Sequence, residues 1–281
     1  MKRGIVVSGG GSWGAFTAGR LQENKYKYDV VIGCSTGALM TPFIALGMYD
    51  ELAAAYSSVI TEDVFDRNPF HKNGNIKIAN AVWSLLSGKR SMGSHLALRQ
   101  TIQIFFTKDM YTKIRQSEID VIVTVCNITK TNNNTEYKSI RDWSYLDFCD
   151  WIWASCAIPA VTTIVEKGGF EYIDGGTLEG APVTCAVNLG CDVIDVYLHS
   201  AEKNVDKKKI NNLVHLLSRV IILMRSEMRE DDLRTRFNDN IKINKLFLPA
   251  DFKTSAMVFD QEIMRQWTLL GREWQKKINN Q

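Results

Sequence analysis

Short apolar runs alternate along the chain with longer segments of helical periodicity. Runs rich in β-branched residues predict buried strands, at Arg3–Ser8, Asp29–Ile32, Ile119–Asn127, Phe170–Ile173, Asp192–Leu198 and, more briefly, Lys245–Leu248. Glu136–Ile140 is predicted to pair with Ile119–Asn127 as a hairpin. Helical spacing predicts the helices Ser12–Gln22, Thr36–Leu46, Asp50–Val59, Ile76–Leu86, His95–Phe106, Tyr145–Cys156, Pro182–Leu189, Val205–Glu230 and a last helix from about Ser255. Strands that alternate with helices predict an α/β fold, with a mostly parallel sheet covered on both faces.

No internal repeat or linker divides the chain. The breaker-rich segments Arg67–Asn75 and Lys130–Thr135 are predicted to be loops inside one domain. We therefore expect a single domain over residues 1–281, with its sequence motifs in a core of about 3–200 and a helical C-terminal part of about 205–281.

Composition narrows the functional classes. Apolar residues make up 45% and charged residues 23% of the chain, as in ordinary globular proteins. A net charge of +3 is too small to indicate nucleic-acid binding, but it is compatible with contact with an anionic membrane surface. The sequence contains no apolar stretch of membrane-spanning length and no signal peptide, so a cytoplasmic protein, peripheral at a membrane at most, is expected.

The cysteines indicate neither disulfides nor a metal site. None of the six forms a C-x-x-C pair, and most lie among apolar neighbours. Reduced, buried thiols are predicted for Cys34, Cys126, Cys149, Cys156, Cys185 and Cys191. No metal is predicted, and nothing in the sequence indicates an oligomeric state.

A glycine-rich segment follows the first predicted strand and opens the first predicted helix. Its spacing, Gly9-x-Gly11-x-x-Gly14, matches the dinucleotide-binding fingerprint. Such a site also needs an acidic residue at the end of the second strand, where it binds a ribose hydroxyl. Asp29 lies at the start of that strand instead, so the dinucleotide hypothesis is disfavoured and no cofactor is predicted.

A second glycine motif, Gly33-Cys34-Ser35-Thr36-Gly37, lies where the second strand turns into a helix. This is the context of a nucleophile elbow, which exposes a serine hydroxyl on a tight turn. Side chains at the flanking glycines would clash with the neighbouring strand and helix. The alternative is a plain tight turn. Under the first hypothesis Ser35 is the nucleophile, and the amides of Gly10 and Gly11, with that of Thr36, are candidate oxyanion donors.

A serine nucleophile requires a base. Among the histidines, His199 follows a predicted strand, where site residues gather in parallel sheets; the others lie in a polar loop or in predicted helices, at His71, His95 and His215. Asp174 also follows a short strand, and Gly175 and Gly176 behind it allow close backbone approach. Asp174 alone and a Ser–Asp–His arrangement are therefore both hypotheses.

Taken together, the motifs resemble those of the patatin-like phospholipase family. The resemblance covers Ile5 to about Val187 and rests on four motifs in order: Ser8-Gly9-Gly10-Gly11-Ser12-Trp13-Gly14, Gly33-Cys34-Ser35-Thr36-Gly37, Ala154-Ser155-Cys156-Ala157-Ile158-Pro159 and Asp174-Gly175-Gly176. It implies a three-layer α/β/α sandwich and hydrolysis of lipid acyl esters without a metal. It also implies a dyad in which Ser35 attacks the ester and Asp174 accepts its proton, so that His199 takes no part.

Lipid or phospholipid esters are the partners that this resemblance implies. The apolar segment Asn212–Met228, flanked by basic residues, is either a core helix or a lipid-contacting element, as the wall of an acyl groove or an interfacial patch. Ala81–Arg90 is a second candidate for lipid access, as a mobile lid. Two alternatives remain: an esterase or thioesterase for soluble substrates, and a catalytically weak lipid-binding or scaffolding protein. The presence of both Ser35 and Asp174 argues against the scaffold.

Overall fold

The computed structural model describes residues 1–200, 209–210, single positions between 216 and 227, 240–249, 252 and 255–280. Its strands are β1 (Arg3–Val7), β2 (Val30–Cys34), β3 (Asp120–Asn127), β4 (Thr135–Ser139), β5 (Val165–Lys167), β6 (Phe170–Asp174), β7 (Val193–Tyr197) and β8 (Lys242–Leu246). Its helices are η1 (Gly11–Trp13), α1 (Gly14–Leu21), α2 (Thr36–Leu46), α3 (Tyr49–Ser58), α4 (Thr61–Val64), α5 (Ile78–Leu86), α6 (Leu96–Phe105), α7 (Lys108–Gln116), α8 (Tyr145–Ser155), η2 (Gly175–Thr177), α9 (Val183–Asn188) and α11 (Gln261–Asn279). The helix predicted at Val205–Glu230 lies, apart from single positions, outside the described residues.

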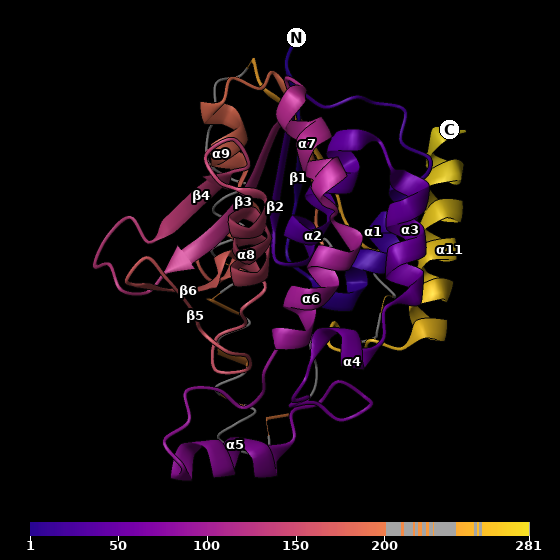
Figure 1. Cartoon of the computed structure of the whole chain (residues 1–281). Coiled ribbons are helices and arrows are strands. Elements are labelled where there is room, and N and C mark those ends of the chain that lie inside the picture. Colours follow the sequence, from indigo (N-terminus) through magenta and orange to yellow (C-terminus); the bar gives the residue numbers. More distant parts are fainter. Residues whose placement is uncertain are drawn as a thin grey trace.

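The strands form one mixed sheet in the order β5-β6-β3-β2-β1-β7-β8, with β4 paired to β3 as the predicted hairpin (Figure 1). The central pairs β1–β2, β2–β3, β1–β7 and β7–β8 are parallel. The pairs β3–β6 and β5–β6 are antiparallel. The prediction of a mostly parallel sheet is therefore confirmed.

Helices cover both faces of this sheet, because successive strand residues point to opposite sides. Along β1, Ile5 and Val7 enter the larger apolar core, and Val6 between them enters the smaller one. The larger core includes residues of α1, α2, α3, α6, α8 and α11, and the smaller includes α9. In Figure 1, α9 lies on one side of the sheet and α1, α3 and α11 on the other, which gives the α/β/α arrangement.

Several element boundaries differ from the predictions. The last helix begins at Gln261 rather than near Ser255, because the Asp260 carboxylate accepts a hydrogen bond from the Ile263 N–H (3.0 Å) and caps it there. The strand predicted at Lys245–Leu248 runs from Lys242 to Leu246. The short strand β5 and the helix α7 were not predicted. The sequence of α7 is mostly polar, and the helix starts where Thr107 caps the Met110 N–H.

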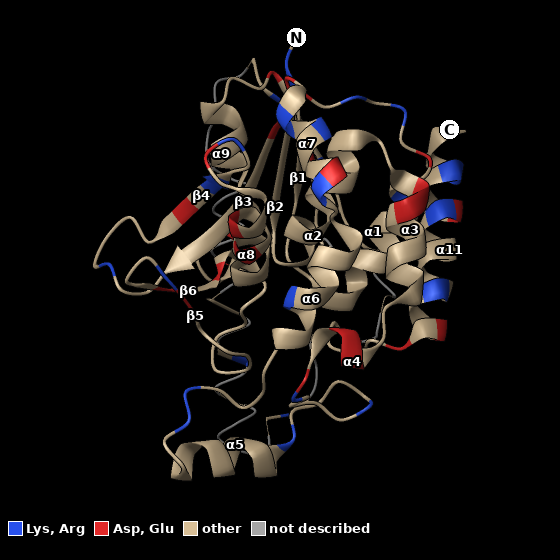
Figure 2. Ribbon diagram, viewed as in Figure 1, with Lys and Arg blue, Asp and Glu red and all other residues tan. Residues whose placement is uncertain are grey.

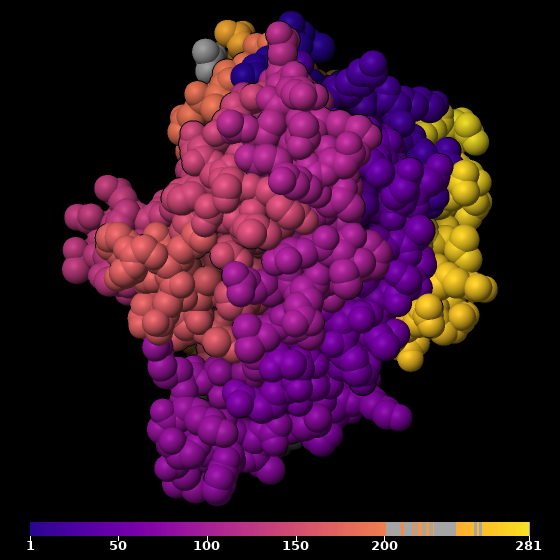
Figure 3. All heavy atoms as spheres, viewed as in Figure 1, coloured from indigo at the N-terminus to yellow at the C-terminus, as the bar shows by residue number. Residues whose placement is uncertain are grey.

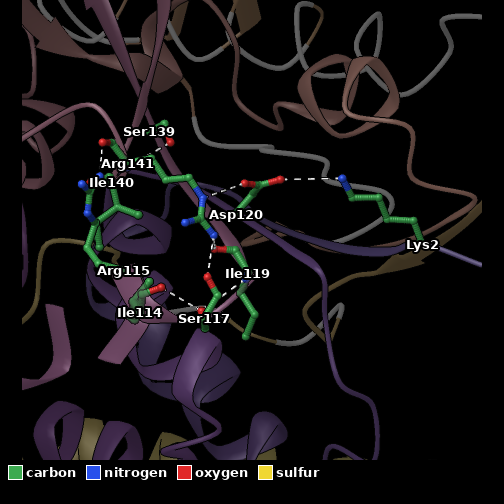
Figure 4. A network of polar contacts seen from close by, with 9 residues as sticks. All are labelled: Lys2, Ile114, Arg115, Ser117, Ile119, Asp120, Ser139, Ile140 and Arg141. Carbon is green, nitrogen blue, oxygen red and sulfur yellow. Dashed lines mark hydrogen bonds and ion pairs between the residues drawn. The ribbon is translucent and has the colours of Figure 1, made fainter. Parts of the chain in front are cut away.

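A polar network ties the amino ends of the central strands together (Figure 4). The Asp120 carboxylate, at the start of β3, lies 3.3 Å from Arg141 Nε and 3.6 Å from Lys2 Nζ. Arg141 also donates to the carbonyl oxygens of Ser117 (2.8 Å) and Ile119 (3.1 Å). Nearby, the Asp29 carboxylate accepts from the Arg3 N–H (2.7 Å). These charges therefore lie at the end of the sheet opposite to the carboxyl ends of β1, β2 and β3.

Candidate active site

Ser35 lies on the turn between β2 and α2, in a backbone conformation that side chains rarely adopt. Its φ is 54° and its ψ is −123°. A Cβ on Gly33 would lie 2.3 Å from the Gly37 carbonyl oxygen, and a Cβ on Gly37 would lie 2.1 Å from the Val7 carbonyl oxygen. The turn can therefore be this tight only with glycine at both positions, and the surrounding contacts hold Ser35 in its strained conformation.

The hydroxyl of Ser155 links this turn to β3 by two hydrogen bonds. It accepts a hydrogen bond from the Ser35 N–H (2.8 Å) and donates one to the carbonyl oxygen of Thr124 in β3 (2.7 Å). Ser155 is fully buried at the end of α8. The sequence pointed to the block around Ser155 without assigning it a contact; a small polar residue in an otherwise apolar helix end was the available signal.

Asp174 reaches the same place from β6. Thr124 of β3 pairs with Cys34, the last residue of β2, and the next residue, Val125, pairs with Asp174, the last residue of β6. Because β4 occupies the other edge of β3 at these positions, β2 and β6 share one edge and their carboxyl ends meet. This pairing brings Asp174 next to the Ser35 turn, although 139 positions separate them in the sequence.

The Asp174 carboxylate is buried, with 2% of the residue exposed. Its Oδ1 accepts from the Gly176 N–H (2.8 Å) and from the Cys34 thiol (3.6 Å between Sγ and Oδ1). A Cβ on Gly175 would lie 2.3 Å from the Thr124 carbonyl oxygen, so the chain behind Asp174 also packs directly on β3. Among the described residues, no direct hydrogen bond joins Asp174 to the Ser35 hydroxyl.

The first glycine motif lies against the Ser35 turn. A Cβ on Gly9 would come within 3.1 Å of Ser35 Cβ. Gly11 has a φ of 54° and lines the same cavity as Ser35 and Thr36. Among the described residues, no acceptor takes the N–H of Gly10 or of Gly11, whereas the Ser12 N–H donates to the Ala256 carbonyl oxygen (2.9 Å).

Thr36 and Gly14 join the two glycine motifs. A Cβ on Gly14 would lie 2.7 Å from Thr36 Oγ1, so α1 and α2 begin in close contact. The buried Tyr56 hydroxyl of α3 lies 2.6 Å from Thr36 Oγ1 and donates to the Thr36 carbonyl oxygen (3.0 Å). The start of α2 is thereby fixed from two sides.

His199 lies under the first glycine motif rather than in a free loop. A Cβ on Gly10 would lie 2.2 Å from His199 Cβ. His199 Nδ1 lies 2.8 Å from the Ser8 carbonyl oxygen, which can only accept, so Nδ1 carries the proton. The His199 N–H also donates to Ser8 Oγ (2.9 Å). Burial lowers the pKa of His199 to about 4, so the ring is neutral near pH 7.

An apolar cavity of about 110 Å³ extends from Ser35 between α2, α3 and α6. Its wall is dominated by large aliphatic and aromatic side chains, among them Leu39, Phe43, Leu52, Tyr56, Leu98, Ile102 and Phe105. Such a lining fits a hydrocarbon chain and disfavours a charged ligand. The sequence did not assign these residues to the site, because their helical spacing equally predicts a core face.

His95, at the start of α6, is a polar exception in this wall. It is 1% exposed and stacks on Trp153, with ring centroids 5.0 Å apart. Among the residues that the structure describes, neither ring nitrogen has a hydrogen-bond partner. Burial lowers the pKa of His95 to about 4, so this imidazole is also neutral.

The segment Ser255–Phe259 closes the site from the C-terminal side. The Ala256 carbonyl oxygen also accepts from Ser12 Oγ (3.1 Å), and a Cβ on Gly11 would lie 2.2 Å from it. Met257 and Phe259 line the cavity. Residues from near the end of the chain therefore fix the conformation of the first glycine motif.

A family model described as Patatin-like phospholipase matches residues 5–187, which is more than half of the chain. The chain belongs to the patatin-like phospholipase family. The matched region begins inside β1, includes the Ser35 turn and Asp174, and ends inside α9. The fold and the family that the four motifs implied are thus confirmed, and with them membership of a family of lipid acyl hydrolases.

Among solved structures, this patatin-like chain is similar to VipD from Legionella pneumophila, with 16% identity and a TM-score of 0.45. The similarity covers 98% of this chain and 66% of that chain. We found no relative among curated proteins.

Two further findings concern the described part of this patatin-like protein. None of the helices there combines the length and the apolarity needed to cross a bilayer. In the same residues, no three histidine, cysteine or acidic side chains come together as a metal site would require.

Proposed function

We propose that this protein hydrolyses the acyl esters of lipids, with Ser35 as nucleophile and Asp174 as its base. The observation that carries the proposal is the convergence of the strained Ser35 turn and the buried Asp174 at the end of an apolar cavity. An aliphatic wall beside a strained serine suits a fatty acyl group better than a small polar ester, so we favour lipids over soluble esters and thioesters.

In the proposed reaction, Ser35 Oγ attacks the acyl carbonyl carbon while its proton passes to Asp174. The N–H groups of Gly10, Gly11 and Thr36 then stabilise the negative oxygen, as helix N-termini and glycine loops can do. The C–O bond to the alcohol breaks, and the alcohol leaves with the proton from Asp174. Water attacks the acyl-enzyme, gives a proton to Asp174, and releases the fatty acid as that proton returns to Ser35. In apo enzymes the serine–base contact is often long and tightens only when substrate is bound.

Ser35→Ala and Asp174→Asn test the dyad. Each should lower the release of fatty acid from phospholipid–detergent micelles by about 1,000-fold or more, because each removes one member of a unit that acts together. Asp109→Asn, on the exposed face of α7, is the matched control and should retain full activity. Circular dichroism establishes that all three variants fold.

Labelling with an alkyl fluorophosphonate separates the enzyme from the scaffold hypothesis. The native chain should gain one label, on the peptide that contains Ser35, and Ser35→Ala should gain none. A folded Ser35→Ala protein with native turnover, or a native protein that takes no label and releases no fatty acid, would contradict the proposal.

A further inference from the structure

Helix α5 turns its polar side to the protein and its apolar side to the solvent. Leu85 is 81% exposed and Leu86 is 80% exposed. The polar residue just before them, Ser84, is only 6% exposed. The Ser84 hydroxyl donates to the Ser91 carbonyl oxygen (3.1 Å). Ile78, Val82 and Trp83 are also at least half exposed. A helix of a protein in water normally has the opposite orientation, so α5 presents a face suited to an apolar environment.

The helix is carried on an arm, which we define as Arg67–Ser94. Figures 1 and 3 show the arm as a lobe that projects from one end of the body, with α5 at its tip. Its two ends pair as an antiparallel bridge between Arg67 and Ser94. The Met92 N–H donates to the Ala160 carbonyl oxygen (2.9 Å), and the Gly93 N–H to that of Val161 (2.8 Å), which fix the base of the arm.

The charge of the arm has one sign. Between Arg67 and Ser94 the sequence has no acidic residue and five basic ones, Arg67, Lys72, Lys77, Lys89 and Arg90. The whole chain has a net charge of only +3, so the arm is much more basic than the rest. Arg90 is neutralised by Glu166 and Glu171. Figure 2 shows basic positions at both ends of α5 and none within it.

The arm also begins and ends at the cavity. Phe65, just before it, and His95, just after it, both line the cavity that contains Ser35. The two ends of the arm therefore connect α5 directly to the cavity wall. A surface bound by α5 would lie on this side of the molecule.

We propose that α5 docks on an anionic phospholipid bilayer, with its apolar face among the acyl chains and the flanking Lys77 and Lys89 at the headgroups. An apolar helix face flanked by lysines, with a tryptophan at its edge, is the composition of an interfacial helix. A second copy of this chain would bring two basic arms together, which like-charge repulsion opposes. This proposal rests on the proposed function in one respect: docking would place lipid esters beside the cavity. Binding to the bilayer does not itself require catalysis.

The test uses the full-length Ser35→Ala protein, so that no lipid is consumed. Its co-sedimentation with vesicles of phosphatidylcholine and phosphatidylglycerol is compared with that of the same protein carrying Leu85→Ser and Leu86→Ser. The double change should weaken vesicle binding by about tenfold or more, because it removes two leucine side chains from the apolar face. Leu269→Ser with Leu270→Ser, an exposed adjacent pair on α11, is the matched control and should bind like the parent.

The lipid composition and a soluble label for Ser35 complete the test. Binding should weaken in vesicles of phosphatidylcholine alone and in high salt, because the lysine contribution is electrostatic. Vesicle binding that is absent, or unchanged by the Leu85/Leu86 substitutions, would overturn the proposal. So would a dimer that dissociates on these substitutions without any vesicle binding. Labelling of the Ser35-containing chain by an alkyl fluorophosphonate, with no vesicles present, reports on the proposed function separately: if the chain takes no label while docking holds, the function is wrong and the surface is not.

Discussion

At the scale of single residues, the structure gives His199 a different role from the one that the sequence suggested. The sequence offered it as a rival base in a strand-end loop. In the fold it is 4% exposed, contacts Gly10, and uses its Nδ1 proton to bind the Ser8 carbonyl oxygen. We therefore propose that His199 positions the first glycine motif, which differs both from acting as a base and from having no functional role.

Two substitutions of His199 distinguish these roles. His199→Asn keeps an N–H donor near the place of Nδ1, so hydrolysis should stay within a few-fold of native. His199→Ala removes the donor and the ring beside Gly10, and we expect a loss of about tenfold in kcat, below the cost of about 100- to 1,000-fold for losing one oxyanion donor outright. Steady-state kinetics from pH 5 to pH 8 provides the check, and the shape of the profile should not change. A thousandfold loss in both variants would instead support the triad.

At the scale of elements, α1 and α11 cross with their backbones in contact. A Cβ on Gly19 of α1 would lie 1.9 Å from the Thr268 carbonyl oxygen, and a Cβ on Gly271 of α11 would lie 2.0 Å from the Phe16 carbonyl oxygen. Since α1 follows the first glycine motif and α11 follows Ser255–Phe259, this crossing sets the position of the segment that contacts Ser12.

Gly271→Val should force the two helices apart. We expect the free energy of unfolding in urea to fall by about 1–3 kcal/mol, as for other overpacked contacts. Activity should fall as well, because the Ala256 contact to Ser12 would loosen. Gln266→Val places the same side chain at an exposed position of α11 and serves as the control for a valine in this helix without a helix–helix contact. Equal stability of the two variants would show that the crossing is not tightly packed.

At the scale of the whole molecule, we propose that the chain is one cooperative unit. β8 is an edge strand paired with β7, and α11 packs on α1 and α3, so the C-terminal residues complete the same sheet and core as the matched family region. A single unfolding transition, identical by tryptophan fluorescence and circular dichroism, is expected.

The stability of this unit should fall as the pH is lowered below 6.5. Burial lowers the pKa of His95 and of His199 to about 4, so between pH 6.5 and pH 4 the unfolded chain binds protons that the folded chain does not. His95→Phe removes one of these groups and keeps an aromatic ring on Trp153. In urea unfolding at pH 7, 6 and 5, it should reduce the pH dependence by up to about 1.4 kcal/mol per pH unit. The same slope in both proteins would contradict this account.

The sequence by itself determined the features that neighbouring residues build. The turn at Ser35 is made by contiguous residues, so the glycines at 33 and 37 were sufficient to predict it. Alternation between short apolar runs and helical periodicity likewise gave the α/β class and most elements. Features without an apolar periodicity were missed. Examples are the mostly polar helix α7 and the start of α11 at Gln261, which a side-chain cap sets.

Only the tertiary structure decided which distant residues meet. Asp174 lies beside the Ser35 turn because β6 takes the edge of β3 at the position where β2 ends, and Ser155 bonds the same turn from the end of α8. The contact of His199 with Gly10 and the outward direction of the apolar face of α5 were likewise decided by tertiary packing. A periodic pattern fixes which side of an element is apolar, but strand register and packing decide what that side contacts.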